Sequence, residues 1–389
     1  MKWFDRELTE CRLRNHLLMI NIVYLYSTLR RTGPTNQLYY LIKYLDRSRF
    51  NPLILTISPE PVNSAYSRFK ELNIRMECLN LGRKSIYVGS DEKVYASLKG
   101  FHPDVVQSYG FRADMYSIRY LKEIASAKIT TVRNDAYYDA SLLYGNILGK
   151  LFASIYTSNL KKMDFIVSCS AHIRDVLHHI GVESEVIRNG IDANCFPFPR
   201  SIEEKEEAKR KLSIDPSKKL ILVVGSLESR KNPFLIIDAF KESKLSSNSI
   251  LSFLGNGPLL KKCRTLSEGE CINFYGNVSN VNEYLLAADV LVSASRGEGF
   301  PNSVLEALTM GVPVLLSNIK PHEEIRGLFP EYVKMFHSDS RDSLIGALDE
   351  LDQNPVSMRK EDVINARELL DASKMSAAYQ KLYLHLMER

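Results

Sequence analysis

The sequence has few cysteines, no long apolar run and no compositionally biased segment. Its six cysteines are scattered over 389 residues without the spacing of a metal site, which is typical of reduced cysteine in a cytosolic protein. The apolar run at 17–26 is too short to span a bilayer, and the charged residues at 2 and 5–7 argue against a secretory signal peptide. We therefore expect a cytoplasmic protein that is not integral to a membrane, with peripheral attachment left open.

The usual marks of a metal site are also missing. The eight histidines have no metal-ligand spacing, and no loop carries a convincing Asp-x-Asp pair of the kind that holds a metal against a diphosphate. We therefore expect neither a metal nor another cofactor. His322, which follows an apolar run at 314–317, has two positions open to it, the donor site and the surface, and we favour the surface.

Two successive α/β patterns run along the chain. Short apolar runs alternate with segments of helical period, which is typical of parallel sheets covered on both faces. We expect strands at 18–26, 52–57, 105–108, 129–132 and 165–169, and again at 220–224, 250–254, 272–275, 290–294 and 314–317. The sequence therefore predicts an α/β protein of two Rossmann-like, doubly wound domains that face each other across a cleft.

Pro197 and Pro199 interrupt the pattern between the two sets of strands. We place an N-terminal domain at 1–188, a linker at 189–200 and a C-terminal domain at 201–370, and we expect the last helix, about 371–389, to pack back on the N-terminal domain. Residues 1–199 hold 26 Lys and Arg against 19 Asp and Glu, whereas the remainder hold 25 against 27. The basic excess indicates an anionic lipid, a phosphate-bearing substrate or nucleic acid as a partner, or scattered solvated charge.

The strongest local signal is the segment RGEGFPNSVLEALTMGVPV at 296–314. Asn302 is a good N-cap, which predicts a helix at 303–310. The glycines before it let a ligand approach the backbone, and the free N–H groups at 303–305 form an anion site suited to a diphosphate. Glu298 and Glu306 are natural acceptors for sugar or ribose hydroxyls. The alternative is an ordinary βα turn with a capped helix.

Glu298 and Glu306 have the Glu-x7-Glu spacing of family 4 glycosyltransferases, and the surrounding Glu-Gly-Phe-Pro-Asn-x3-Glu-Ala-x3-Gly-Val-Pro-Val is typical of that family. The chain therefore resembles these retaining enzymes, which have the GT-B fold, and in particular the group 1 type that builds bacterial capsule and O-antigen polysaccharide. The resemblance implies that Glu298 contacts the donor sugar and Glu306 the ribose. It also implies backbone contacts to the sugar and phosphates from Gly299, Phe300, Pro301, Asn302, Ser303, Val304 and Leu305.

Other segments follow in the family's order, so the resemblance covers nearly the whole chain. The segment VGSLESRKNP at 224–233 looks like the first strand and loop of the family's nucleotide domain, where Lys231 would reach the donor diphosphate and stabilise the leaving group. Asn232 is expected to cap the next helix. Many relatives have Arg directly after the glycine, whereas this chain has Ser226. Whether Arg230 supplies the lost charge is left open.

Further donor contacts are implied at two places. The segment FYGNV at 274–278 matches the strand whose end lies near the nucleotide base, which implies Gly276, Asn277 and Val278. In the loop after the first strand, the N–H of Gly33 would face the diphosphate from the opposite wall; the alternative is an ordinary loop glycine. The turn GNGP at 255–258 is assigned to structure, because a tight turn needs glycine for backbone reasons.

Arg133 stands where many relatives have a histidine. An arginine at the end of a strand would bind a phosphate or polarise the acceptor, but it cannot be a general base because it stays protonated. The structural alternative is a salt bridge to Asp135 or Asp139.

The resemblance implies a hexosyltransferase-like enzyme that moves a sugar, with retention and without metal, from a nucleotide-diphosphate donor to a hydroxyl of a glycan or lipid-linked acceptor. The donor is a UDP-sugar by default, and no nucleic acid partner is expected. Two alternatives remain. One is a nucleotide-sugar epimerase or hydrolase on the same fold. The other is a degenerate nucleotide-binding scaffold subunit, which Ser226 and Arg133 indicate.

An apolar stripe in the N-terminal half has two interpretations. It is a core helix, or it is a helix lying on anionic lipid that holds the enzyme peripherally at the inner face of the cytoplasmic membrane. The second interpretation puts Tyr144 and Tyr156 at the interface and uses the basic pair Lys161 and Lys162. The stripe consists of Leu143, Ile147, Leu148, Leu151, Phe152 and Ile155.

Overall fold

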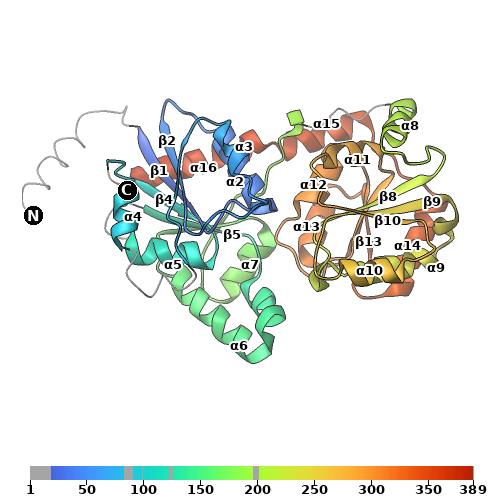
Figure 1. Cartoon of the computed structure of the whole chain (residues 1–389), viewed down its shortest axis with the longest axis horizontal. Helices are drawn as coiled ribbons and strands as arrows, with labels where there is room; N and C mark the ends of the chain where they lie inside the picture. Colours follow the sequence, from blue (N-terminus) through green and yellow to red (C-terminus); the bar gives the residue numbers. More distant parts are fainter. Residues whose placement is uncertain are drawn as a thin grey trace, which may run out of the picture.

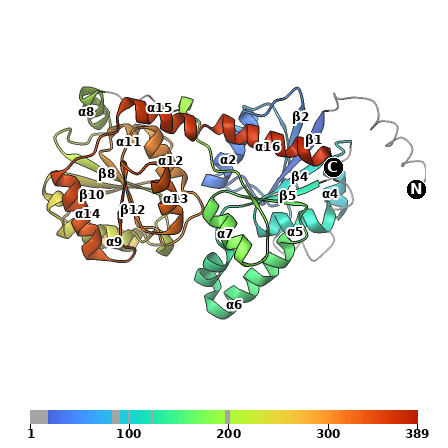
Figure 2. The same ribbon diagram turned by 180° about the vertical axis from the view of Figure 1, so that it is seen from behind.

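The computed structural model describes residues 19–82, 91–98, 100–121, 125, 127–195 and 201–388. Two α/β domains lie side by side, each built around one parallel sheet (Figures 1 and 2). This confirms the predicted fold class. Pro197 and Pro199, on which the predicted linker rested, lie outside the described residues.

The N-terminal sheet has seven strands in the order β3-β2-β1-β4-β5-β6-β7, all parallel. The five predicted strands form its centre, and the two edge strands β3 and β7 were not predicted. The strands are β1 (Ile20–Tyr26), β2 (Phe50–Thr56), β3 (Arg75–Cys78), β4 (Val105–Ser108), β5 (Ala127–Val132), β6 (Phe165–Ser168) and β7 (Glu185–Val186).

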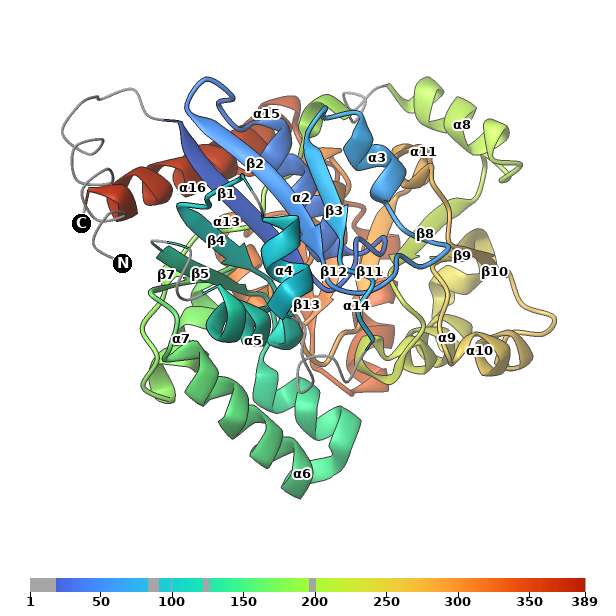
Figure 3. The same cartoon turned by 60° about the vertical axis from the view of Figure 1, so that its left-hand side comes forward.

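Helices cover both faces of this sheet. The C-terminal helix α16 packs with α2 on one face, and α4 and α5 pack on the other (Figure 3). The helices of this domain are α2 (Gly33–Lys43), α3 (Tyr66–Lys70), α4 (Asp91–Ser97), α5 (Phe111–Tyr120), α6 (Ala136–Leu160) and α7 (Ala171–His179), joined by α16 (Ala372–Met387).

The C-terminal sheet has six parallel strands in the order β10-β9-β8-β11-β12-β13. They are β8 (Lys219–Val224), β9 (Ser249–Leu254), β10 (Ile272–Gly276), β11 (Val290–Ser293), β12 (Val314–Ser317) and β13 (Val333–Phe336), of which β13 was not predicted. The helices are α8 (Ile202–Lys211), α9 (Pro233–Glu242), α10 (Leu260–Leu266), α11 (Val281–Ala287), α12 (Asn302–Thr309), α13 (Lys320–Leu328), α14 (Arg341–Gln353) and α15 (Lys360–Leu369). Three 3-10 helices complete the described elements: η1 (Ala193–Cys195), η2 (Ser229–Lys231) and η3 (Lys244–Asn248).

The chain crosses between the domains twice, and the two crossings are paired. The N–H of Ile191 donates to the carbonyl of Leu370 at 2.6 Å, and the N–H of Ala372 donates to the carbonyl of Ile191 at 3.1 Å. Gly190 fits here because an added Cβ would lie 2.5 Å from the Cα of Ala372. The second crossing returns the chain to the N-terminal sheet.

Side chains of α16 complete the buried interior of the N-terminal domain. Tyr379 and Tyr383 are buried against the sheet, and the hydroxyl of Tyr383 lies 3.3 Å from that of Tyr24 and donates to Gln107. The hydroxyls of Tyr379 and Thr131 lie 3.1 Å apart. Each of these four hydroxyls therefore has a partner, as burial of polar groups requires.

Candidate active site

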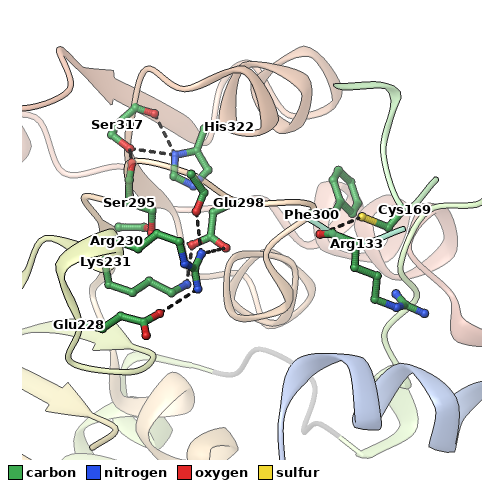
Figure 4. Close-up of polar contacts among 12 residues, drawn as sticks. Arg133, Cys169, Glu228, Arg230, Lys231, Ser295, Glu298, Phe300, Ser317 and His322 are labelled. Atoms are coloured by element: carbon green, nitrogen blue, oxygen red, sulfur yellow. Dashed lines mark hydrogen bonds and ion pairs between the residues drawn. The ribbon is translucent and has the colours of Figure 1, made fainter. Parts of the chain in front are cut away.

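Glu298 lies at the centre of a cluster of charged and polar side chains from three loops (Figure 4). Lys231 Nζ donates to Glu298 Oε1, and Arg230 Nη1 donates to Oε2 at 3.0 Å. The hydroxyl of Ser295 donates to Oε1 at 2.7 Å. Arg230 also contacts Glu228, with Nη2 donating to its Oε1 at 3.0 Å. The loops that follow β8 and β11 therefore bring Lys231, Arg230 and Glu298 together, although 67 residues separate Lys231 from Glu298.

The two cations keep Glu298 ionised. Burial alone would raise the pKa of Glu298, but the charges of Lys231 and Arg230 and the hydrogen bonds from Lys231 and Ser295 outweigh it and lower the pKa to about 2. The carboxylate is thus an acceptor-only group at any physiological pH. Arg230 supplies a second cation beside Glu298, and its replacement of the charge missing at Ser226 stays a prediction.

His322 was expected on the surface, and this was wrong, because its side chain is fully buried beside the cluster. Its Nδ1 lies 2.8 Å from the carbonyl oxygen of Ser317, an arrangement in which Nδ1–H donates and Nε2 keeps its lone pair. Burial lowers the pKa of His322 to about 4, so the ring is neutral. Nε2 is buried with no hydrogen-bond partner among the described residues. A hydroxyl of a ligand would satisfy it.

Glu306 is partly buried one turn into α12, and no hydrogen bond or ion pair is recorded for its carboxylate within the described part of the chain. Burial raises its pKa to about 7, against a smaller opposing effect of the Arg68 charge. A partly desolvated carboxylate without protein donors is ready to accept hydrogen bonds from a ligand.

Of the two asparagines predicted as caps, Asn232 holds the N-cap position of α9 without a side-chain cap bond, and Asn302 is not a cap. The helix α12 begins one residue earlier than predicted, with Pro301 as the N-cap and Asn302 as its first residue. The carbonyl of Pro301 consequently accepts from Val304 and Leu305, so the two amides that stay uncommitted within the described helix are those of Asn302 and Ser303. Asn232 precedes α9 in a left-handed conformation, makes no side-chain cap bond, and donates instead to Asp339 at 2.9 Å.

The side chain of Asn302 joins the two domains. Its Nδ2 donates to the carbonyl of Gly33 at 3.2 Å, and its Oδ1 accepts from Gln37 at 3.2 Å and from Asn189 at 2.9 Å. Gly33 is the first residue of α2, so the N-terminal ends of α2 and α12 meet at this point. Two helix N-termini that converge favour an anion between them.

A cavity of about 290 Å³ opens beside Glu298, between the domains. The C-terminal domain contributes the loops around Glu298 and the start of α13. The N-terminal domain contributes the end of β5, the start of α6 and one residue of α7, namely Asn134, Asp135, Tyr138, Asp139 and His172. Burial raises the pKa of Asp139. The cavity is therefore shared between an ionised donor-loop glutamate and polar groups of the opposite domain.

Comparison with known proteins agrees with this geometry. Residues 204–368 match Glycosyl transferases group 1, and residues 31–194 match Glycosyltransferase Family 4. The O-antigen biosynthesis glycosyltransferase WclY of Escherichia coli is 25% identical over 381 residues, covering 94% of this chain and 99% of its own. The chain is a family 4 glycosyltransferase of the group 1 type.

Solved structures agree on the fold of this glycosyltransferase, which is GT-B. Sucrose-phosphate synthase from Thermosynechococcus elongatus superposes with a TM-score of 0.80 at 14% identity, covering 95% of this chain and 99% of that chain. HepE from Anabaena, solved in complex with UDP and glucose, superposes with a TM-score of 0.73 at 14% identity, covering 93% and 99%.

The glycines of the glycosyltransferase's donor loop are required by the opposite domain. An added Cβ at Gly297 would lie 2.4 Å from the ring of Tyr138, and one at Gly299 would lie 1.7 Å from the carbonyl oxygen of Arg133. From the sequence, these glycines were predicted to let a ligand approach the backbone. The structure adds a second reason for them, because they let the end of β5 and the start of α6 approach the donor loop, and the approach of a ligand stays a prediction.

Among the described residues, no ion pair joins Arg133 to Asp135 or Asp139, so the salt bridge that was the structural alternative for Arg133 is not formed. Its side chain is only 9% exposed, donates to Asn189 of the linker, and lies 5.9 Å from the ring of Tyr109. Asp135 caps α6 by accepting from two backbone amides. The guanidinium of Arg133 points away from Glu298 (Figure 4), so its predicted catalytic role has no support from this arrangement.

Gly276, Asn277 and Val278 lie at the end of β10, at the far edge of the C-terminal sheet. No hydrogen bond or ion pair recorded in the described chain joins them to Glu298, and their base contact stays a prediction. The turn after β9 has a structural reason for its glycine, because an added Cβ at Gly255 would lie 1.9 Å from the carbonyl oxygen of Gly225.

Proposed function

We propose that the enzyme binds a UDP-sugar in its C-terminal domain and transfers the sugar, with retention, to a hydroxyl of a growing cell-surface glycan, lipid-linked and presented at a membrane. The observation that carries the proposal is the Lys231–Glu298–Arg230 cluster, of which Glu298 and Arg230 line the interdomain cavity. The name of the relative WclY places that protein in O-antigen synthesis, and the HepE structure holds UDP and glucose.

The proposed donor site uses groups that have few protein partners. The uncommitted amides of Asn302 and Ser303 face an anion, Glu306 accepts from the ribose hydroxyls, and His322 accepts from a sugar hydroxyl through Nε2. Lys231 has to exchange part of its contact with Glu298 for the diphosphate. Glu298 is then freed to accept hydrogen bonds from the sugar.

The proposed chemistry needs no protein nucleophile. The acceptor oxygen attacks the anomeric carbon on the face that the diphosphate leaves, and the C–O bond to the phosphate breaks. The departing phosphate oxygen takes the acceptor proton. Glu298 is unsuited to covalent catalysis because three donors hold its oxygens and its pKa is about 2.

Glu306→Ala is expected to weaken UDP binding by roughly 1.5–3 kcal/mol, because hydrogen bonds to a charged acceptor are lost. Titration calorimetry measures the change. Glu306→Gln should lose less, because the amide oxygen still accepts. An alanine variant with unchanged affinity for UDP would contradict the ribose contact.

The same carboxylate predicts a pH dependence. The free carboxyl has a pKa of about 7, and its ionised form is the better acceptor, so binding should release a proton and affinity should fall as the pH drops. The expected loss is up to about tenfold between about pH 8 and about pH 6. Glu306→Gln should abolish this dependence.

Turnover in excess EDTA is expected to equal turnover without it. Lys231 and the helix N-termini stabilise the leaving diphosphate in place of a metal. The direct test is a donor-turnover assay after chelation. Inhibition by EDTA that Mg²⁺ or Mn²⁺ reverses would sink the metal-free proposal.

A thermal-shift panel of nucleotide sugars tests the donor assignment, because a ligand that binds only the native state raises its apparent stability. UDP-sugars should raise the melting temperature more than GDP- or ADP-sugars. Absence of any shift would reject the proposed function, and a preference for another base would correct the donor.

A further inference from the structure

The second half of α6 exposes an apolar face. Ile147 is 86% exposed, Leu148 62%, Leu151 59% and Ile155 47%. The spacing puts all four on one side of the helix. The helix projects from the N-terminal domain (Figures 1 and 3). Contiguous apolar exposure of this kind marks an interaction surface.

The opposite face of the same segment is well packed, so the exposed side is fixed in place. Phe152 packs on Phe111 with ring centroids 4.6 Å apart, and Tyr156 and Leu160 are buried. Gly149 allows close contact with the first half of the helix, because an added Cβ would lie 2.7 Å from Ala140. The core-helix interpretation therefore holds for one face only. The interfacial position expected for Tyr156 was wrong, and the side chains of Leu143 and Tyr144 lie outside the described residues.

The charge of this segment is of one sign. Residues 140–163 contain Lys150, Lys161 and Lys162 and no acidic residue. All three lysines are exposed. Apolar side chains flanked by lysines match an anionic lipid surface, where the ammonium groups reach the headgroups while the apolar groups enter the interface. No described helix is long and apolar enough to span a bilayer, so the contact would be peripheral.

The same helix reaches the cavity. Its N-cap Asp135 and the side chains of Tyr138 and Asp139 line the space beside Glu298. The backbone bends at Gly145, where φ is +76°, between the cavity-lining half and the exposed half. The two halves pack on each other at Gly149, which lies against Ala140, so the exposed half and the cavity-lining half form one unit.

We propose that residues 147–160 of α6, with Lys161 and Lys162 directly after it, seat the enzyme on an anionic bilayer and that a lipid-linked acceptor enters the cavity along the first half of the helix. The choice of acceptor rests on the proposed function. The seating itself depends only on the exposed face and its charge.

Co-sedimentation of the full chain with phosphatidylcholine vesicles, with and without phosphatidylglycerol, tests the seating. Wild type should bind the anionic vesicles more tightly, and salt should weaken binding. The double variant Ile147→Gln, Leu151→Gln should lower the partition roughly tenfold or more. A matched double variant on other surfaces, Ile202→Gln with Leu369→Gln, removes residues that are 74% and 53% exposed and should bind as wild type does.

The lysines allow a second test of the seating, through their charge. Replacing Lys150, Lys161 and Lys162 with Gln should lower binding to anionic vesicles about fivefold per lysine. The same change at the exposed residues Lys211, Lys261 and Lys381 should have a much smaller effect. Equal binding to neutral and anionic vesicles, or no binding at low salt, would overturn the proposal.

Two further measurements separate the possible failures. Sedimentation equilibrium that shows dimers of wild type but not of the Ile147–Leu151 variant, without vesicle binding, would assign the face to a second copy of the chain and reject the lipid. The Ile147–Leu151 variant and the triple lysine variant should keep the rise in melting temperature that UDP-sugars cause in wild type. If UDP-sugars did not raise the melting temperature of wild type, the proposed function would be rejected, independently of the result of vesicle binding.

Discussion

Lys231→Ala is expected to lower turnover by roughly 100-fold or more, because removal of a preorganised charge stabiliser has effects of that size. Lys231 Nζ donates to Glu298 Oε1, and Glu298 lines the interdomain cavity. Turnover at saturating donor measures the loss. Since Lys231 is the strongest of the effects that lower the pKa of Glu298, the variant should also raise that pKa.

The control for this variant is Lys241→Ala. Lys241 lies near the C-terminus of α9, whereas Lys231 precedes the N-terminus of that helix. Lys241 pairs with Glu270 at 3.7 Å and should be replaceable with little change in turnover. If Lys231→Ala folded normally and kept its turnover within a few fold, the leaving-group assignment would be wrong. Arg230→Ala would then be the next variant to measure, because its guanidinium also reaches Glu298.

Gly299→Ala should reduce turnover on the order of 100-fold while nucleotide binding is largely kept, because a displacement of about 1 Å at reacting groups costs that much. The added methyl would lie 1.7 Å from the carbonyl oxygen of Arg133 in the opposite domain. The added methyl group would therefore keep the two domains from approaching closely, without altering the donor domain itself.

A matched control is Gly346→Ala, since an added Cβ there meets nothing within 4 Å. Calorimetry with UDP and a turnover assay on each variant separate the two effects. Equal losses of affinity and turnover in Gly299→Ala would indicate damage to the donor loop, and the role in domain approach would be abandoned.

The centres of both sheets could be predicted from the sequence because their strands are buried on both faces and read as apolar runs. The edge strand β3 could not, because Arg75 and Glu77 alternate with Met76 and Cys78 and are partly or largely exposed. β7 has two residues, too few for a periodic signal.

The site was predictable where one segment carries it, as with Glu298 and Glu306. It was not predictable where side chains from the other domain decide the contact. Asn302 has the composition of a cap, yet its side chain is engaged by Gly33, Gln37 and Asn189. His322 carried no signal of burial, because the Ser317 carbonyl that holds its ring lies at the end of another element.

The position of α16 has a consequence for synthesis. The N-terminus of a nascent chain leaves the ribosome first, and N-terminal domains generally fold first. Here Met375, Tyr379, Leu382 and Tyr383 belong to the interior of the N-terminal domain but are translated after all strands of the C-terminal sheet. The N-terminal domain therefore stays incomplete, with Tyr24 and Phe50 not yet covered by Tyr383, until α16 has been translated. The C-terminal domain, whose sheet is translated before α16, can finish folding first.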